Sequence, residues 1–136
     1  MAENINRVVV IGGGYAGVLA ANRLQRPGLN VTLINPRPRF VERIRLHQLV
    51  AGNHAATAAY ADVLGPDVRL VVDTAERIDA PGRRVLLASG GEVGYDYLIY
   101  AVGSGAATPT VPGAAEFGYP IADLDQAQRL TAALGT

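Results

Sequence analysis

Glycines at positions 12, 14 and 17 give the strongest chemical signal in the sequence. They follow the β-branched run 7–11 and precede the alanine- and leucine-rich run 18–26, an order typical of a strand, a tight turn and a helix. Gly12 would let the chain turn off the strand, Gly14 would let backbone approach a pyrophosphate, and Gly17 would let the helix pack closely on the sheet. The free N–H groups and positive dipole end of the helix would face the phosphates. This pattern predicts a dinucleotide-binding turn, with a plain glycine loop as the alternative.

Asn35 is the second residue with candidate chemistry. It follows the apolar run 30–34 and lies 18 residues after Gly17, where dinucleotide-binding domains commonly carry an acidic residue for the ribose hydroxyls. An amide can hydrogen-bond a hydroxyl, and it does not repel a 2′-phosphate. We therefore interpret Asn35 as a ribose contact. Arg37 has two interpretations, a residue beside the phosphate of NADP or part of a solvated proline turn, and we favour the second.

The elements that must position these residues alternate between strand and helix. The first helix should end at Pro27, which cannot continue the hydrogen-bond ladder. A second strand over 30–34 should then pair in parallel with the first through a right-handed crossover. Together these elements predict the start of a doubly wound α/β sheet.

Two further helices are predicted before the middle of the chain. One covers 40–52, and a weaker one covers 55–64. Arg43 and His47 would lie four residues apart on the first of them. Such a pair can face a cofactor, but the interpretation favoured by composition alone is a solvated face.

The pattern changes from residue 68 onward. After a strand over 68–72, three short extended segments are separated by turn residues and predict an antiparallel meander, namely 75–78, 83–88 and 92–95. The apolar run 97–102 then fits a central parallel strand whose carboxyl end, at Gly103, lies where doubly wound sheets bind ligands. A buried strand with a simple glycine exit is the alternative.

The C-terminal part of the sequence predicts a connector and one helix. Proline, glycine and alanine dominate 106–120. Asp123 can cap the helix that follows, with Gln126 three residues later as in a capping box, and this helix should run to about Leu134.

Composition excludes several classes of function. The 136 residues include no cysteine, which excludes disulfides, thiolate metal sites and thiol redox chemistry. The formal net charge is zero, so no electrostatic footprint for nucleic acid is present. No apolar run approaches the ~20 residues of a membrane span, and a cytoplasmic location is the default expectation. The basic residues are all arginine, so phosphate contacts must come from arginine or from backbone N–H groups.

The glycine turn, the meander and the run 95–103, which reads Tyr-Asp-Tyr-Leu-Ile-Tyr-Ala-Val-Gly, together resemble a known family. They look like the FAD-binding N-terminal half of the pyridine nucleotide-disulfide oxidoreductase superfamily. Residues 40–48 are similar to its cysteine-free branch, which includes type II NADH dehydrogenases and apoptosis-inducing-factor-like oxidoreductases. The resemblance covers nearly the whole chain. It implies a Rossmann-like FAD-binding α/β domain over 1–105, a parallel sheet with an inserted three-stranded antiparallel meander, incomplete at the C-terminus. Residues 106–136 would lead toward an NAD(P)H-binding domain.

The resemblance also implies a set of cofactor-binding residues. The FAD pyrophosphate would be held by Gly12, Gly14, Tyr15, Ala16 and Gly17. Asn35 would meet the adenosine ribose, and Ala75 would meet adenine through its backbone. Ala101 and Gly103 would line the flavin dinucleotide, and Arg43 would lie beside the cofactor. The resemblance implies no catalytic residue and no metal ligand in these 136 residues.

The sequence departs from the family in three places. Asn35 replaces an acidic residue, and Val102 replaces a common threonine. The second glycine-rich turn, which binds NAD(P)H in the family, is absent from the 136 residues.

The leading expectation is therefore the FAD-binding portion of an NAD(P)H-dependent flavoprotein oxidoreductase, a fragment that is not competent alone. The full enzyme would pass electrons from NAD(P)H through FAD to an acceptor such as a quinone. A non-catalytic nucleotide-binding module and a truncated product are the alternatives, and an incomplete sheet also predicts self-association.

Overall fold

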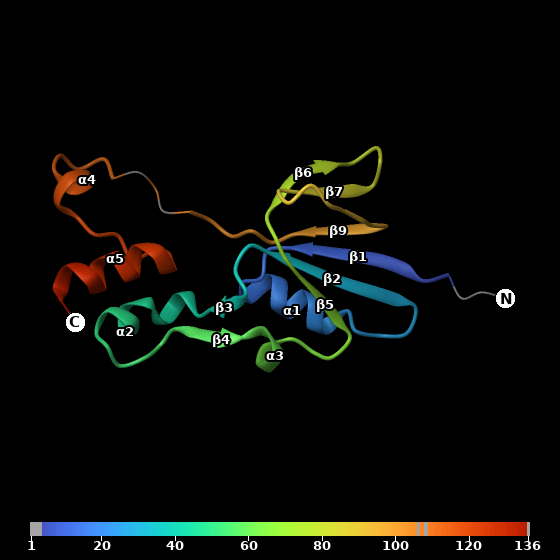
Figure 1. The fold of residues 1–136 in the computed structure, drawn as a ribbon, viewed down its shortest axis with the longest axis horizontal. Coiled ribbons are helices and arrows are strands. Elements are labelled where there is room, and N and C mark those ends of the chain that lie inside the picture. The colour runs from blue at the N-terminus through green and yellow to red at the C-terminus, as the bar shows by residue number, and fades with distance from the viewer. Residues whose placement is uncertain (1–3, 106, 108, 136) are drawn as a thin grey trace. The chain divides into compact units, whose positions relative to one another are not determined.

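The computed structural model describes residues 4–105, 107 and 109–135 and shows an α/β protein (Figure 1). The strands are β1 (Asn6–Ile11), β2 (Leu29–Asn35), β3 (Arg39–Val41), β4 (Thr57–Ala59), β5 (Val68–Val72), β6 (Ala75–Asp79), β7 (Arg84–Leu87), β8 (Glu92–Gly94) and β9 (Tyr97–Tyr100). The helices are α1 (Tyr15–Arg23), α2 (Leu46–Val50), α3 (Tyr60–Val63), α4 (Ala114–Phe117) and α5 (Leu124–Leu134), with a 3₁₀ turn η1 (Arg43–Arg45). The predicted strand, turn, helix and strand at the N-terminus are confirmed.

A parallel sheet forms the framework of the N-terminal part. Its strand order is β5-β2-β1-β9, and β1 pairs in parallel with both β2 and β9. Successive side chains of β1 point to opposite faces of the sheet. Val8 and Val10 therefore share one face, and Val9 and Ile11 share the other, yet all four side chains are at most 4 % exposed. Layers on both faces bury the β-branched run that marked this strand in the sequence.

The predicted central position of the last parallel strand is wrong. Among the described residues β9 pairs only with β1, so it is an edge of the sheet. Tyr97 is 62 % exposed and Tyr100 is 69 % exposed. An apolar run does not distinguish a central strand from an edge strand, because the neighbour that would cover it comes from elsewhere in the chain.

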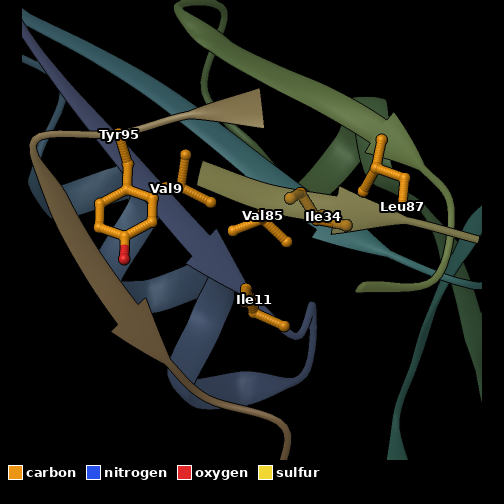
Figure 2. Packing of buried hydrophobic residues seen from close by; sticks show 6 residues of the cluster. All are labelled: Val9, Ile11, Ile34, Val85, Leu87 and Tyr95. Carbon is orange, nitrogen blue, oxygen red and sulfur yellow. The ribbon is translucent and has the colours of Figure 1, made fainter. Parts of the chain in front are cut away.

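The predicted antiparallel meander is confirmed as a separate three-stranded sheet, β6-β7-β8. It packs on the face of the parallel sheet that carries Val9 and Ile11, and Figure 2 shows the buried cluster that joins the two layers. This cluster contains Val9, Ile11, Ile34, Val85, Leu87 and Tyr95. The meander therefore covers one face of the sheet, and α1 lies on the opposite face beside Val10.

Helix α1 ends earlier than the sequence predicts, at Arg23 instead of residue 26. The N–H of Leu24 is shared between the carbonyls of Ala20 and Ala21, at 3.1 and 3.3 Å, which tightens the last turn. Gln25 then leaves the helix, and its Oε1 accepts a hydrogen bond from the backbone N–H of Asp67 at 3.1 Å. The helix thus ends in a tightened turn before it reaches Pro27.

The two predicted helices in the middle of the chain are largely wrong. The range 40–52 contains the end of β3, the turn η1 and only the short helix α2, and the range 55–64 contains β4 before α3. Phe40 is 7 % exposed because its ring lies between those of Tyr15 and Tyr60, with centroid separations of 5.3 and 6.4 Å. These contacts favour an extended backbone at Phe40 over a helical one.

The structure divides into two compact units. The first contains the described residues up to Phe40 together with Ala59–Gly103, and the second contains Val41–Ala58 with the described residues from Ser104 onward. The core of the second unit consists of Leu46, Ala56 and Ala127. The domain division predicted at residue 105 stays a prediction.

The predicted C-terminal helix is confirmed as α5. The Asp123 carboxylate accepts from the backbone N–H of Gln126 at 2.9 Å, and the Gln126 side chain accepts from the N–H of Ala122 at 3.2 Å. The helix ends at Leu134, as predicted, and Gly135 after it has a φ of +69°. In the predicted connector 106–120 the described residues form only α4, and residues 106 and 108 lie outside the described part of the chain.

Among the described residues no helix is long and apolar enough to cross a bilayer.

Candidate functional site

The two glycine segments of the sequence meet at the carboxyl ends of β1 and β9. Gly12 has a φ of +102°, and its N–H donates to the carbonyl of Ile34 at 2.9 Å. A Cβ on Gly12 would collide with the carbonyl oxygen of Ala101 and lie 2.9 Å from the Cα of Val102. The N–H of Ala101 in turn donates to the carbonyl of Ile11 at 2.8 Å. Only glycine satisfies both the backbone conformation and the close approach of the chain after β9 at position 12.

Gly17 lets the start of α1 pack on the glycine turn. It is buried, and a Cβ there would collide with the carbonyl oxygen of Gly12 and contact Cγ1 of Val10 at 3.5 Å. The role predicted for the last glycine, close packing between helix and sheet, is therefore visible in the contacts.

Gly14 has the opposite surroundings. It is exposed, and a Cβ there would meet no atom within 4 Å among the described residues. It is also the N-cap residue of α1, which makes no side-chain cap and has no acidic residue in its first turn. The N–H groups of a first helical turn have no acceptor within the helix. The exposed residues Gly14, Tyr15 and Ala16 thus form an open N-terminus with positive dipole character, which can bind an anion.

Gly13, between the predicted residues, is held from two sides. Its N–H donates to Oδ1 of Asn35 at 3.0 Å, and the hydroxyl of Tyr60 donates to its carbonyl oxygen at 2.7 Å. Burial raises the pKa of Tyr60 to about 12, so the hydroxyl stays protonated and donates at neutral pH. Neither contact has a signal in the sequence, because Asn35 lies 22 residues and Tyr60 lies 47 residues from Gly13.

Asn35 ends β2 at the predicted place, and its side-chain amide also hydrogen-bonds the glycine turn. Besides accepting from Gly13, it donates through Nδ2 to the carbonyl of Arg37 at 2.9 Å. An amide oxygen has a second lone pair and an amide nitrogen a second hydrogen. A ribose contact by Asn35 stays a prediction that is compatible with both bonds.

Ala75 lies shortly after the carboxyl end of β5. The N–H of Asp73 donates to the carbonyl of Asn35 at 3.0 Å, which joins the carboxyl ends of β2 and β5. Ala75 then opens β6, pairs with Leu87, and is partly buried against the cluster between the two sheets. Gly103, with a φ of +72°, follows β9 at this edge.

Arg43 belongs to the second compact unit, whereas the glycine turn belongs to the first. Its Nε donates to the carbonyl of Ala122 at 2.8 Å. Arg43 is in η1 and His47 is in α2, so the predicted shared helix face does not form. Both side chains are exposed. A contact between Arg43 and a cofactor stays a prediction.

The described residues contain no cluster of three or more histidine, aspartate or glutamate side chains that could hold a metal ion. At the carboxyl edge the groups that can bind a ligand are the backbone N–H groups at the start of α1, its helix dipole and the amide of Asn35.

Comparison with known proteins gives consistent relatives. The chain is 38 % identical over 136 residues to an NADH dehydrogenase-like protein of Mycobacterium tuberculosis, covering 93 % of this chain and 34 % of that protein. It is 27 % identical over 143 residues to the type II NADH:quinone oxidoreductase of Staphylococcus haemolyticus, covering 96 % and 34 %. The solved sulfide:quinone oxidoreductase of the hyperthermophilic bacterium Aquifex aeolicus superposes with a TM-score of 0.79 at 27 % identity, covering 96 % of this chain and 32 % of that one. The chain thus spans about a third of the length of these relatives.

A family model described as pyridine nucleotide-disulphide oxidoreductase matches residues 6–136, which is almost the whole sequence. The glycine turn, the parallel sheet and the meander all lie within the matched range. This chain belongs to the pyridine nucleotide-disulphide oxidoreductase family.

Proposed function

We propose that this chain is the FAD-binding portion of an NAD(P)H-dependent flavoprotein oxidoreductase. The observation that carries the proposal is the uncapped N-terminus of α1, open at Gly14 and set at the point where β1 and β9 end together. Ligands of doubly wound sheets bind at such carboxyl ends. The names of the relatives support electron transfer from NADH and a quinone as acceptor.

The surroundings of Gly14 fit a pyrophosphate. The space in front of this residue is open, and the N–H groups near the start of α1 are donors without a side-chain cap. In the proposal the pyrophosphate accepts from the backbone of Gly14, Tyr15 and Ala16, while Gly12 and Gly17 shape the turn. Backbone donors suit this role because they are held in place before the ligand arrives.

The remaining predicted residues would contact the other parts of the cofactor. Asn35 would hydrogen-bond the adenosine ribose, and Ala75 would meet adenine through its backbone. Ala101 and Gly103 would line the flavin dinucleotide, and the family resemblance assigns Arg43 to the cofactor as well. When bound, the flavin supplies the hydride and electron chemistry, and these residues only bind and orient it. We propose no turnover by the 136 residues alone, since the sequence has no second glycine-rich turn for NAD(P)H.

The direct test is titration of the purified chain with FAD, followed by flavin fluorescence and absorbance. The proposal predicts saturable binding of one FAD per chain. A folded chain that leaves the fluorescence of added FAD unchanged would contradict it.

A non-catalytic module that binds NADP is the second candidate, and the neutral amide of Asn35 favours it. An amide does not repel a 2′-phosphate as a carboxylate does. Parallel titrations with NADP and FAD separate the two candidates. Binding of NADP without binding of FAD would support the module and contradict the flavoprotein proposal.

Self-association is a further part of the proposal, and it rests on β9. This strand is a sheet edge among the described residues and carries the exposed Tyr97 and Tyr100. An unpaired edge presents free backbone donors and acceptors to another chain. Sedimentation should show dimers that dissociate in a Tyr100→Lys variant, whereas a wild-type monomer at all concentrations would contradict this. The cytoplasmic location stays a prediction.

A further inference from the structure

Gly13 is the one residue of the turn whose peptide groups are both held by side chains. Asn35 accepts from its N–H at 3.0 Å, and Tyr60 donates to its carbonyl at 2.7 Å. A Cβ on Gly13 would collide with the Tyr60 hydroxyl and lie 3.0 Å from Cγ of Asn35. The two side chains therefore fit closely around Gly13, which immediately precedes the N-cap residue of α1.

Tyr60 also reaches the first residue of α1 by a second route. Its ring makes an edge contact with Phe40 at a centroid separation of 6.4 Å, and Phe40 makes another with Tyr15 at 5.3 Å. Tyr60 is only 4 % exposed, and closely packed aromatic rings have few alternative positions. Tyr60 thus holds the backbone before the N-cap by a hydrogen bond, and through Phe40 it supports one edge of the otherwise exposed Tyr15 ring after the N-cap.

We propose that Tyr60 is a positioning residue for the dinucleotide site, because its hydroxyl fixes the Gly13 peptide and thereby the direction of the N–H groups at the start of α1. This inference rests on the proposed function, since the N–H groups are those offered to the pyrophosphate. Asn35 shares the task through its bond to the N–H of Gly13. Tyr60 touches no part of the ligand and acts only through the turn.

Preorganisation explains why such a residue matters for binding. A donor that is already oriented loses less freedom when the ligand arrives. Without the Tyr60 hydroxyl, the carbonyl of Gly13 loses its described partner, and the peptide group between Gly13 and Gly14 can rotate. The N–H groups after it would then have to be ordered during binding, which weakens affinity without changing any ligand contact.

The test compares Tyr60→Phe with Tyr95→Phe in the full chain. Tyr95 is a matched control because it is also buried in the first unit, at 8 % exposure, and its hydroxyl has no partner among the described residues. Hydrogen exchange of the ligand-free proteins should show faster exchange at residues 13–17 in Tyr60→Phe alone. FAD affinity should fall about three- to tenfold in Tyr60→Phe, the range expected for one lost hydrogen bond, and stay unchanged in the control.

A second pair of variants separates positioning from general loosening. Both Asn35→Asp and Asn35→Leu lose the bond from Nδ2 to the carbonyl of Arg37, but only Asn35→Asp keeps an oxygen that accepts from the N–H of Gly13. Hydrogen exchange at residues 13–17 should stay near the wild-type rate in Asn35→Asp and rise in Asn35→Leu.

The ³¹P resonances of bound FAD should shift in Tyr60→Phe and not in Tyr95→Phe, a change that lost stability alone does not produce.

The possible results distinguish a failure of the Tyr60 role from a failure of the proposed FAD binding. Equal exchange at residues 13–17 in Tyr60→Phe and Tyr95→Phe, or an FAD affinity in Tyr60→Phe equal to that of the wild type, would overturn the role of Tyr60. A wild-type chain that binds no FAD would overturn the proposed function and the dinucleotide part of this role with it. In that case the exchange rates still decide whether Tyr60 holds the turn.

Discussion

The two ends of the parallel strands in the first unit are stabilised in different ways. At the carboxyl end, close main-chain contacts hold the turn together with the hydrogen bonds of Asn35 and Tyr60 to Gly13. Glycine is required where Gly12 meets Ala101 and where Gly17 meets Gly12. At the amino end, side chains of opposite charge join β1 to the residue before β9. The carboxyl end therefore keeps its backbone donors available, whereas the amino end uses its polar groups internally.

The pairing at the amino end is bidentate. Asp96 accepts from Nε and Nη2 of Arg7 at 3.2 and 3.1 Å and from its backbone N–H at 2.7 Å. The N–H of Asp96 donates back to the carbonyl of Arg7 at 2.8 Å. The hydrogen bonds and charge of Arg7 hold the pKa of Asp96 below its usual value of 3.8. A polar hollow of about 500 Å³ lies beside this pair. Ligand binding is therefore expected at the carboxyl end, where the N–H groups at the start of α1 stay open.

The largest effect is expected from Gly17→Ala, which breaks the main-chain packing at the carboxyl end. The new Cβ collides with the carbonyl oxygen of Gly12, a backbone atom that cannot move without shifting the turn. We expect a loss of about 3 kcal/mol in the free energy of unfolding, at the upper end of typical overpacking costs. Urea denaturation measures it.

Gly14→Ala is the matched control, because its Cβ meets open space. It should cost less than about 1 kcal/mol, the scale of replacing a glycine N-cap by alanine. Equal losses in the two variants would remove the distinction between the packed and open glycines of the turn.

A smaller effect is expected from Val102→Thr, which sharpens the binding role of the carboxyl end. Val102 is 51 % exposed directly after the residue that contacts Gly12. A hydroxyl there adds a hydrogen-bonding group without adding volume, and we expect FAD affinity to rise about threefold, the value of a modest hydrogen bond. Titration of Val102→Ser and Val102→Ala separates the hydroxyl from the lost methyl groups. A weaker affinity in Val102→Thr than in the wild type would contradict the expectation.

The smallest effect at neutral pH is expected from Asp96→Asn at the amino end, where the pair is solvent-accessible. The pKa of Asp96 is lowered in the folded chain, so its charged form stabilises the fold above about pH 4 and this contribution is lost as pH falls through the folded pKa. The variant should be less stable than the wild type at pH 7, and the difference should shrink in acid.

Thermal melts of both proteins between pH 7 and pH 2 measure this convergence. Asp79, whose pKa is lowered chiefly by its hydrogen bond to Arg84, keeps a separate acid dependence in both proteins. A stability difference that grows toward low pH would contradict the role given to Asp96.

The sequence predicts local features of the fold well, because their causes are local. The glycines of the first turn, the parallel strands and the meander turns follow from residue types at short spacing. The cap of α5 also does, since Asp123 and Gln126 lie three residues apart and form the predicted bond. These signals need no knowledge of distant neighbours.

The errors arise where distant residues decide the structure. Phe40 carries no local strand signal, yet its contacts with Tyr15 and Tyr60 place it in an extended segment. The edge position of β9 depends on which strands exist beside it, and its apolar run does not report that. Tyr60 contacts Gly13 across 47 residues, so the sequence could not assign it to the turn.

The most direct measurement of the central claim is FAD binding by a Gly14→Val variant, with folding monitored in the same sample. Gly14 has an extended backbone, with φ of −83° and ψ of −162°, and open space around it, so valine should fold there. The account predicts FAD affinity lowered about 100-fold, because the side chain fills the approach to the N–H groups of α1. A Gly14→Val chain that melts as the wild type does and binds FAD equally tightly would contradict it.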